Sequence, residues 1–130
     1  MDKNILIIDD DEEMCEELRD ILSSEGYSVK CVHDGLSGKN LIVEDLYDVV
    51  LLDIKLPKLS GYEVLKFTKA SPNKCKIFVM TGRPDIKYET GKVKDSALED
   101  EERALKLSDG VISKPFEVQK ILDTIKQALM

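Results

Sequence analysis

Short runs of hydrophobic residues, each ending in a polar residue, recur along the chain. Residues 49–52 are apolar at every position and end at Asp53, and residues 5–8 end in the same way at Asp9. Runs this short, bounded by carboxylates, are typical of strands that helices cover on both faces, as in parallel sheets. Three weaker strand patterns are predicted at residues 27–32, 76–81 and 111–113.

The segments between these runs carry apolar residues at helical spacing. The first begins after Asp10 and Asp11, either of which can cap it, although we favour Asp11, and it ends at Gly26. The apolar positions of the last segment form one stripe: Val118, Ile121, Leu122, Ile125 and Leu129. We therefore expect helices over about residues 12–25, 35–46, 62–70, 98–107 and 117–129.

Strands and helices alternate five times, which predicts an α/β fold with a parallel sheet and helices on both of its faces. The carboxyl ends of parallel strands lie at one edge of the sheet, where such folds bind their ligands. This topology would gather five polar residues at that edge: Asp9, Asp10, Asp53, Thr81 and Lys114.

The chemistry of this set points to phosphoryl transfer. Clustered carboxylates repel one another, and a divalent cation is the simplest relief. An all-oxygen set favours Mg²⁺, which is typically bound by one or two carboxylates and a phosphate oxygen. Asp53 is then a candidate nucleophile that forms an aspartyl phosphate. Thr81 and Lys114 would supply a donor and a charge for the phosphoryl oxygens.

Composition narrows the class of protein. A chain of 130 residues is expected to form one domain, residues 1–130. Its net charge of −7 argues against direct binding of nucleic acid. No apolar run is long enough to span a membrane and no signal peptide pattern is present, so we expect a cytoplasmic protein. The three cysteines are expected to be reduced, mostly core thiols, and His33 a surface residue.

The residues at the strand ends form an ordered set: Asp9-Asp10, Asp53, the turn from Leu56-Pro57 to Gly61, Thr81 and Lys114-Pro115-Phe116. Over essentially the whole chain, this set resembles the receiver domain of two-component response regulators. The resemblance implies a flavodoxin-like (βα)5 fold with a five-stranded sheet in the order 2-1-3-4-5. It also implies a Mg²⁺-dependent phospho-acceptor that takes a phosphoryl group from a histidine kinase or phosphotransfer protein. The signal would pass to a downstream output protein through changed contacts, which can include a phosphorylation-dependent dimer.

The resemblance also assigns roles to residues of this chain. The metal ligands that it implies are Asp9, Asp10, Asp53 and the backbone carbonyl of Lys55. The groups that would receive the phosphoryl oxygens are Thr81, the amide of Gly82 and Lys114. In this family the bond between the residues that match Lys114 and Pro115 is usually cis.

The chain departs from the receiver pattern near the site. The segment at about residues 82–97 is longer than most receivers need, and its sequence fits a small hairpin or a mobile loop equally well. Val111 stands where the family often has a Tyr or Phe that swings inward, which puts that form of switching in doubt.

Two basic residues mark a further departure. Lys55 and Arg83 occupy positions that flank the phosphoryl group in receivers. They would bind a dianion and cannot orient an attacking water as a carboxylate or carboxamide would, so we expect a long-lived phospho-Asp53.

These observations favour a receiver domain that is not an enzyme. A phosphohydrolase of the aspartyl-phosphate type would need a second Asp at the position of Lys55. Two alternatives stay open: a pseudo-receiver that binds partners without phosphorylation, and a receiver fragment of a longer transcriptional regulator or hybrid kinase.

Overall fold

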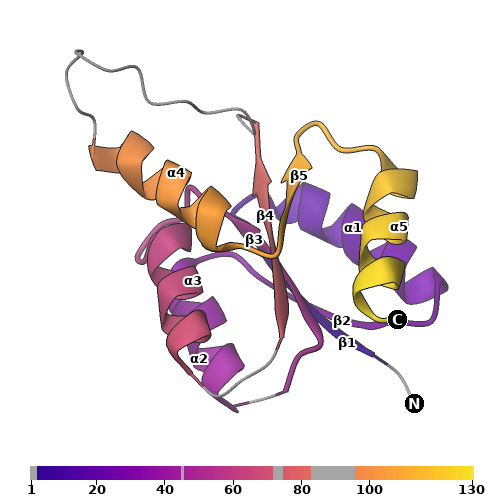
Figure 1. Ribbon diagram of the computed structural model, residues 1–130. Coiled ribbons are helices and arrows are strands. Elements are labelled where there is room, and N and C mark those ends of the chain that lie inside the picture. Colours follow the sequence, from indigo (N-terminus) through magenta and orange to yellow (C-terminus); the bar gives the residue numbers. More distant parts are fainter. Residues whose placement is uncertain (1–2, 45, 72–74, 83–95) are drawn as a thin grey trace.

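A computed structural model describes residues 3–44, 46–71, 75–82 and 96–130, without the side chains of residues 96–101. Five strands alternate with five helices in this part of the chain (Figure 1). The strands are β1 (Asn4–Ile8), β2 (Ser28–Val32), β3 (Val49–Asp53), β4 (Lys76–Thr81) and β5 (Gly110–Ser113). The helices are α1 (Glu12–Ser24), α2 (Gly35–Glu44), α3 (Gly61–Ala70), α4 (Ser96–Leu107) and α5 (Val118–Ala128).

The strands form one parallel sheet in the order β2-β1-β3-β4-β5. This order confirms the predicted α/β class and the flavodoxin-like arrangement. All five residues of β3 are buried, as are the last four of β1, because these strands lie inside the sheet between two helical layers. Their uninterrupted apolar sequence follows from burial on both faces.

Helices cover both faces of the sheet. α1 and α5 lie on one face, and α2, α3 and α4 lie on the other (Figure 1). Alternate residues of a strand point to opposite faces, and β3 serves both layers in this way. Val49 and Leu51 pack in the cluster that includes α1 and α5, whereas Val50 and Leu52 pack with α2, α3 and α4.

The helix ends agree with most of the local signals in the sequence. The carboxylate of Asp11 caps α1 by accepting a hydrogen bond from the amide of Met14 at 3.0 Å, and Gly26 follows the helix with a φ of +96°. α2 ends at Glu44, before the predicted residue 46. The apolar stripe predicted for α5 is unevenly covered: Ile121 and Ile125 are buried, whereas Val118, which begins the helix, is 39% exposed.

Two glycines permit close backbone contacts beside the carboxyl end of β3. A Cβ on Gly35 would collide with the backbone carbonyl oxygen of Leu59, and the Gly35 amide donates to the carbonyl of Pro57 at 3.2 Å. A Cβ on Gly61 would collide with the carbonyl oxygen of Asp53. The loop after β3 therefore packs tightly on the start of α2 and on its own strand.

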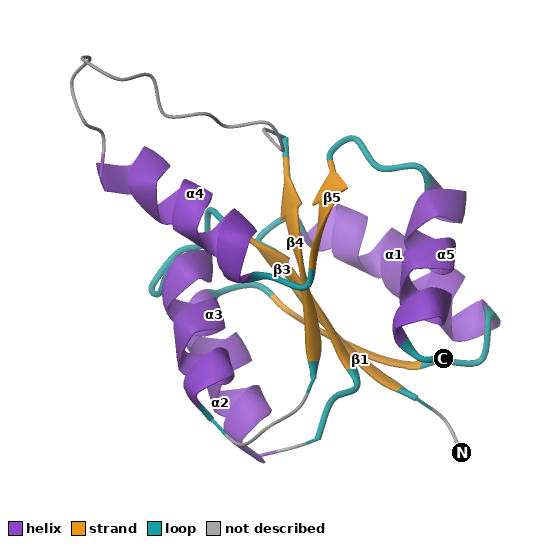
Figure 2. Ribbon diagram, in the orientation of Figure 1, coloured by secondary structure: helices purple, strands orange, loops and turns teal. Residues whose placement is uncertain are grey.

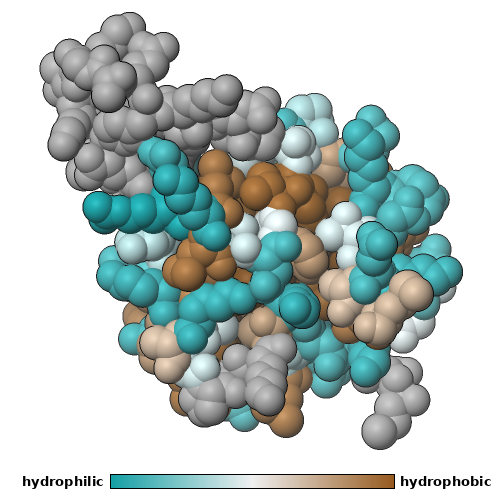
Figure 3. Space-filling view, in the orientation of Figure 1, coloured by the Kyte–Doolittle hydropathy of each residue, from teal (hydrophilic) through white to brown (hydrophobic). Residues whose placement is uncertain are grey.

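Figure 3 shows hydrophilic side chains over much of one face of the molecule, with hydrophobic ones gathered between α4 and α5. Val111 of β5 is 40% exposed, and it stands at the position where receivers often carry an aromatic ring. The prediction of a hairpin or loop at residues 82–97 falls mostly on residues 83–95, which lie outside the described residues.

Within the described chain, no helix has the length and apolar character that crossing a membrane requires.

Candidate functional site

The register of the sheet brings the predicted site residues to one edge. Ile8 pairs with Leu52, so Asp9 follows β1 directly beside Asp53 at the end of β3. Thr81 ends β4 and pairs with Ser113, so Lys114 leaves β5 next to it. Figure 2 shows the arrowheads of β4 and β5 at the same end of the sheet.

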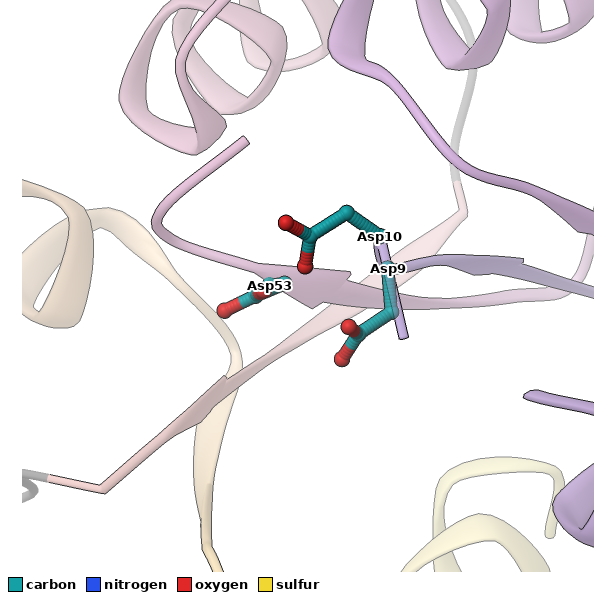
Figure 4. Close-up of side chains that lie close together, drawn as sticks. All are labelled: Asp9, Asp10 and Asp53. Atoms are coloured by element: carbon teal, nitrogen blue, oxygen red, sulfur yellow. The ribbon is translucent and has the colours of Figure 1, made fainter. Parts of the chain in front are cut away.

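Three carboxylates cluster at this edge. Asp9, Asp10 and Asp53 each offer an oxygen, and these oxygens lie within 4.8 Å of one another. Asp9 is fully buried and Asp53 is 9% exposed, while Asp10 faces solvent. Figure 4 shows the three side chains at the adjoining ends of β1 and β3. The cluster is therefore buried on its inner side and open at Asp10.

Lys114 supplies a positive charge to the cluster. Its Nζ lies 2.6 Å from Oδ2 of Asp9 and 3.7 Å from Oδ2 of Asp53. Burial alone would lower the pKa of Lys114, but the hydrogen bond to Asp9 and the charge of Asp53 outweigh burial and raise it. The Lys114 ammonium group therefore stays protonated, and it lies closer to Asp9 than to Asp53.

The backbone aims Lys114 at this position. Its amide donates a hydrogen bond to the carbonyl of Thr81 at 2.8 Å, which continues the β4–β5 pairing by one residue. The bond between Lys114 and Pro115 is cis, as the family resemblance implied.

Burial and repulsion raise the pKa of Asp53, so it is a weaker acid than an ordinary aspartate. Removal from water and the negative charge of Asp9 raise the pKa of Asp53 to about 6, although Lys114 and a hydrogen bond from the amide of Lys55 act in the opposite direction. At neutral pH the carboxyl is mostly ionised, yet it is a stronger base than an ordinary aspartate. This combination suits a nucleophile.

Asp9 is held in place by contacts that the sequence analysis did not identify. One of its carboxylate oxygens accepts a hydrogen bond from the amide of Asp11 at 3.0 Å. Its carbonyl oxygen lies 2.9 Å from Nδ1 of His33 and 3.4 Å from Sγ of Cys15. His33 is half-buried, so the expectation of a plain surface residue missed its contact with Asp9. Because Ile8 pairs with Val32 in the sheet, the next residues of the two strands, Asp9 and His33, lie side by side.

The remaining predicted residues lie around the cluster. Thr81 is 7% exposed, and Gly82 follows it at the surface. The side chain of Lys55 is exposed, while its amide faces Asp53. Arg83 lies outside the described residues, so the expected effect of two flanking cations stays a prediction.

The donor set fits a hard divalent cation. Among the described residues, Asp9, Asp10 and Asp53 are the single group of three acidic, His or Cys side chains close enough to share an ion. All three donors are oxygens, which suits Mg²⁺ rather than a thiophilic metal. The exposed carboxylate of Asp10 leaves room for the waters that Mg²⁺ retains.

Comparisons with known proteins agree with this geometry. The family model described as the response regulator receiver domain matches residues 5–126. A solved receiver domain protein from Methanospirillum hungatei, described as CheY-like, is 30% identical and superimposes with a TM-score of 0.79, covering 99% of this chain and 94% of that one.

Two curated relatives are also similar over nearly all of this chain. The response regulator MprA of Mycobacterium bovis is 30% identical over 129 residues, which cover 99% of this chain and 51% of the relative. The transcriptional regulatory protein YkoG of Bacillus subtilis is 33% identical over 126 residues, 97% of this chain and 50% of the relative. The chain thus spans about half the length of the curated relatives it matches.

Proposed function

The chain belongs to the family of response regulator receiver domains, and on that premise we propose that it is a phospho-acceptor of a two-component system, with Asp53 as the acceptor. The observation that carries the proposal is the position of Asp53 between two acidic side chains and one cation. Asp9 and Asp10 lie within 4.8 Å of it, and Lys114 Nζ is 3.7 Å away. Such a site can hold a metal ion and a phosphoryl group together.

The proposed reaction is a simple transfer. A carboxylate oxygen of Asp53 attacks the phosphorus of a phosphohistidine, an O–P bond forms, and the P–N bond of the donor breaks. The electron pair of that bond stays on the imidazole of the donor. Asp53 must be ionised to attack, and with a pKa of about 6 it is mostly ionised at pH 7.

The chain's own groups would stabilise the transferred phosphoryl group. Thr81, the amide of Gly82 and Lys114 lie at the strand ends that face Asp53, and they are the proposed donors to the phosphoryl oxygens. In doing so Lys114 would share its charge between Asp9 and the new phosphate. The salt bridge at 2.6 Å to Asp9 keeps this lysine at the site before transfer.

Asp9, Asp10, Asp53 and the carbonyl of Lys55 are the proposed ligands of Mg²⁺. When bound, Mg²⁺ would offset the negative charges of the carboxylates and of the phosphoryl oxygens.

We further propose that the domain signals by protein contact rather than by acting as an enzyme. Its phosphoryl donor would be a histidine kinase or a phosphotransfer protein in the cytoplasm. Its curated relatives are about twice as long as the matched region, so the output partner can belong to the same polypeptide or to a separate protein.

Acetyl phosphate tests the proposal directly. The protein is incubated with this small phosphoryl donor with and without Mg²⁺, and intact mass is measured. We expect one added phosphoryl group in the wild type with Mg²⁺, and none in Asp53→Asn, because an amide oxygen is a far weaker nucleophile than a carboxylate. Unmodified wild-type protein, with circular dichroism showing an intact fold, would contradict phospho-acceptance and favour a binding module that works without phosphorylation.

Neighbouring aspartates provide a matched test of the metal ligands. Asp10→Asn should weaken Mg²⁺ binding by about tenfold or more, because it removes a charged ligand from the cluster. Asp11→Asn should leave Mg²⁺ affinity nearly unchanged, because Asp11 caps α1 through Met14 and asparagine caps as well as aspartate. Calorimetric Mg²⁺ titration of both variants measures the difference. Equal losses in the two variants would show that Asp10 has no special role as a ligand.

A further inference from the structure

Two cysteines from different elements meet beneath the acidic cluster. Cys15 lies in the first turns of α1 and is fully buried, while Cys31 lies in β2 and is half-buried. The thiol of Cys31 donates a hydrogen bond to the carbonyl oxygen of Cys15 at 3.5 Å, so the two residues are in direct contact. Cys75 packs on the opposite face of the sheet, so it is separate from this pair.

The pair touches the site through the backbone of Asp9. Sγ of Cys15 lies 3.4 Å from the carbonyl oxygen of Asp9, the same oxygen that His33 contacts. The thiol of Cys15 donates to this oxygen, and the thiol of Cys31 donates to the carbonyl of Cys15. A chain of two hydrogen bonds therefore links Cys31 to the backbone of Asp9.

The environment of Cys31 favours its reactive form. The neighbouring Cys15 thiol, helped by the charges of Arg19 and His33, lowers the pKa of the Cys31 thiol despite partial burial. Burial instead raises the pKa of Cys75. Because the thiolate is the nucleophile in thiol oxidation, Cys31 combines access to solvent with the more reactive state.

We propose that Cys15 and Cys31 are an oxidation site, at which a peroxide closes a disulfide between α1 and β2 within one molecule. The geometry that supports this is the contact of the Cys31 thiol with the backbone of Cys15, which joins β2 to α1. The proposal goes beyond phosphoryl transfer and does not depend on it.

The chemistry needs two steps and one equivalent of peroxide. The sulfur of Cys31 attacks one peroxide oxygen, the O–O bond breaks, and Cys31 becomes a sulfenic acid while hydroxide leaves with its electron pair. The sulfur of Cys15 then attacks the sulfur of Cys31, the S–O bond breaks, and the departing hydroxide takes the Cys15 proton as water. The two thiols lose two electrons in total, which reduce the peroxide.

Formation of the disulfide would also change the hydrogen bonds of Asp9. A disulfide has no S–H group, so the carbonyl of Asp9 would lose Cys15 as a donor and keep His33. The sulfurs must also approach to about 2.05 Å, which draws the first turns of α1 toward β2.

Peroxide oxidation followed by peptide mapping tests the site. The reduced protein, residues 1–130, is treated with hydrogen peroxide, quenched, alkylated after denaturation and digested. In the wild type we expect a linked peptide that joins Cys15 to Cys31, with Cys75 recovered alkylated, and reversal by dithiothreitol. The Cys31 thiol should be lost at least about tenfold faster than the Cys75 thiol, because of its access and its lowered pKa.

Cysteine variants provide the controls. Cys75→Ser should form the same link, whereas Cys31→Ser should leave Cys15 reduced, because Cys15 is buried and would lack its partner. The wild-type map tests the proposal even if a variant folds poorly. Three results in folded wild-type protein would overturn it: both thiols still reduced, Cys31 converted to a sulfinic acid without a link, or links that involve Cys75 or a second molecule.

Discussion

Replacing Asp53 with asparagine should raise the free energy of unfolding of the metal-free protein at neutral pH by about 1 to 3 kcal/mol. The folded protein holds this carboxyl among like charges and mostly out of water, which raises its pKa to about 6. In the unfolded chain an aspartate has a pKa of about 3.9. Ionised Asp53 is therefore less stable in the folded state than in the unfolded state, and asparagine removes that cost.

The pH dependence follows from the same shift. Between about pH 4 and pH 6 the folded protein keeps the Asp53 proton that the unfolded chain has lost. The wild type should therefore lose stability from this group as the pH rises through that window, while Asp53→Asn should not. The stability difference should be small below pH 4 and reach its full size above about pH 7. Urea unfolding of both proteins in chelator, at several pH values, measures it.

Mg²⁺ and a distant aspartate are the controls for this result. Mg²⁺ should reduce or reverse the advantage of Asp53→Asn, because ion binding stabilises the folded wild type more than a variant with one carboxylate fewer. Asp123→Asn, on the exposed surface of α5, should change stability by less than about 0.5 kcal/mol. If Asp53→Asn were less stable than the wild type in chelator at pH 7.5, burial of Asp53 and its repulsion by Asp9 would not lower the stability of the metal-free protein.

Gly35→Ala should destabilise the fold by roughly 2 to 4 kcal/mol. Alanine is normally better than glycine inside a helix, by about 0.5 to 1 kcal/mol. At Gly35, however, the new Cβ would collide with the backbone carbonyl of Leu59, and a backbone atom cannot rotate away as a side chain can. The loop after β3 must therefore shift away from α2, and thermal or urea denaturation reports the cost.

Two other glycines form a graded comparison. A Cβ on Gly38 would press on the end of the Ile8 side chain, which can adjust, so Gly38→Ala should cost less than Gly35→Ala. A Cβ on Gly82 meets no described atom within 4 Å, and Gly82→Ala should be nearly neutral. If Gly35→Ala were as stable as Gly82→Ala, the loop at Leu59 could move away from α2 without loss of stability, and the expected collision would have no cost.

Much of the fold could be predicted because its local signals agree. The apolar runs at residues 5–8 and 49–52 mark strands buried on both faces, and the polar residue that ends each run marks the site edge. The family order then supplied the strand arrangement, which aligns Asp9 with Asp53 and Thr81 with the strand before Lys114. The alternation of strands and helices thus placed the site residues at one edge, and the family order placed their strands side by side.

Contacts that depend on packing could not be predicted. Nothing in the sequence shows that Lys114 lies closer to Asp9 than to Asp53, because the distances depend on how β5 leaves the sheet. The hydrogen bond from the Cys31 thiol to the carbonyl of Cys15 joins a strand to a helix, and helical spacing does not reveal which strand residue a helix meets. Val118 fits the apolar period of α5 but begins the helix and is 39% exposed, which helical spacing does not reveal.

During translation, the nascent chain contains the three aspartates of the site before it contains Lys114. Asp9, Asp10 and Asp53 are made first and can meet as soon as β1 and β3 pair, whereas Lys114 is made later, after β5. At about 5 to 20 residues per second, several seconds of translation separate Asp53 from Lys114. During that time the acidic cluster lacks its lysine, so only solvent, dissolved ions or protonation of a carboxylate can offset the repulsion among its members. Asp9 therefore gains its ion pair with Lys114 only after β5 has been made.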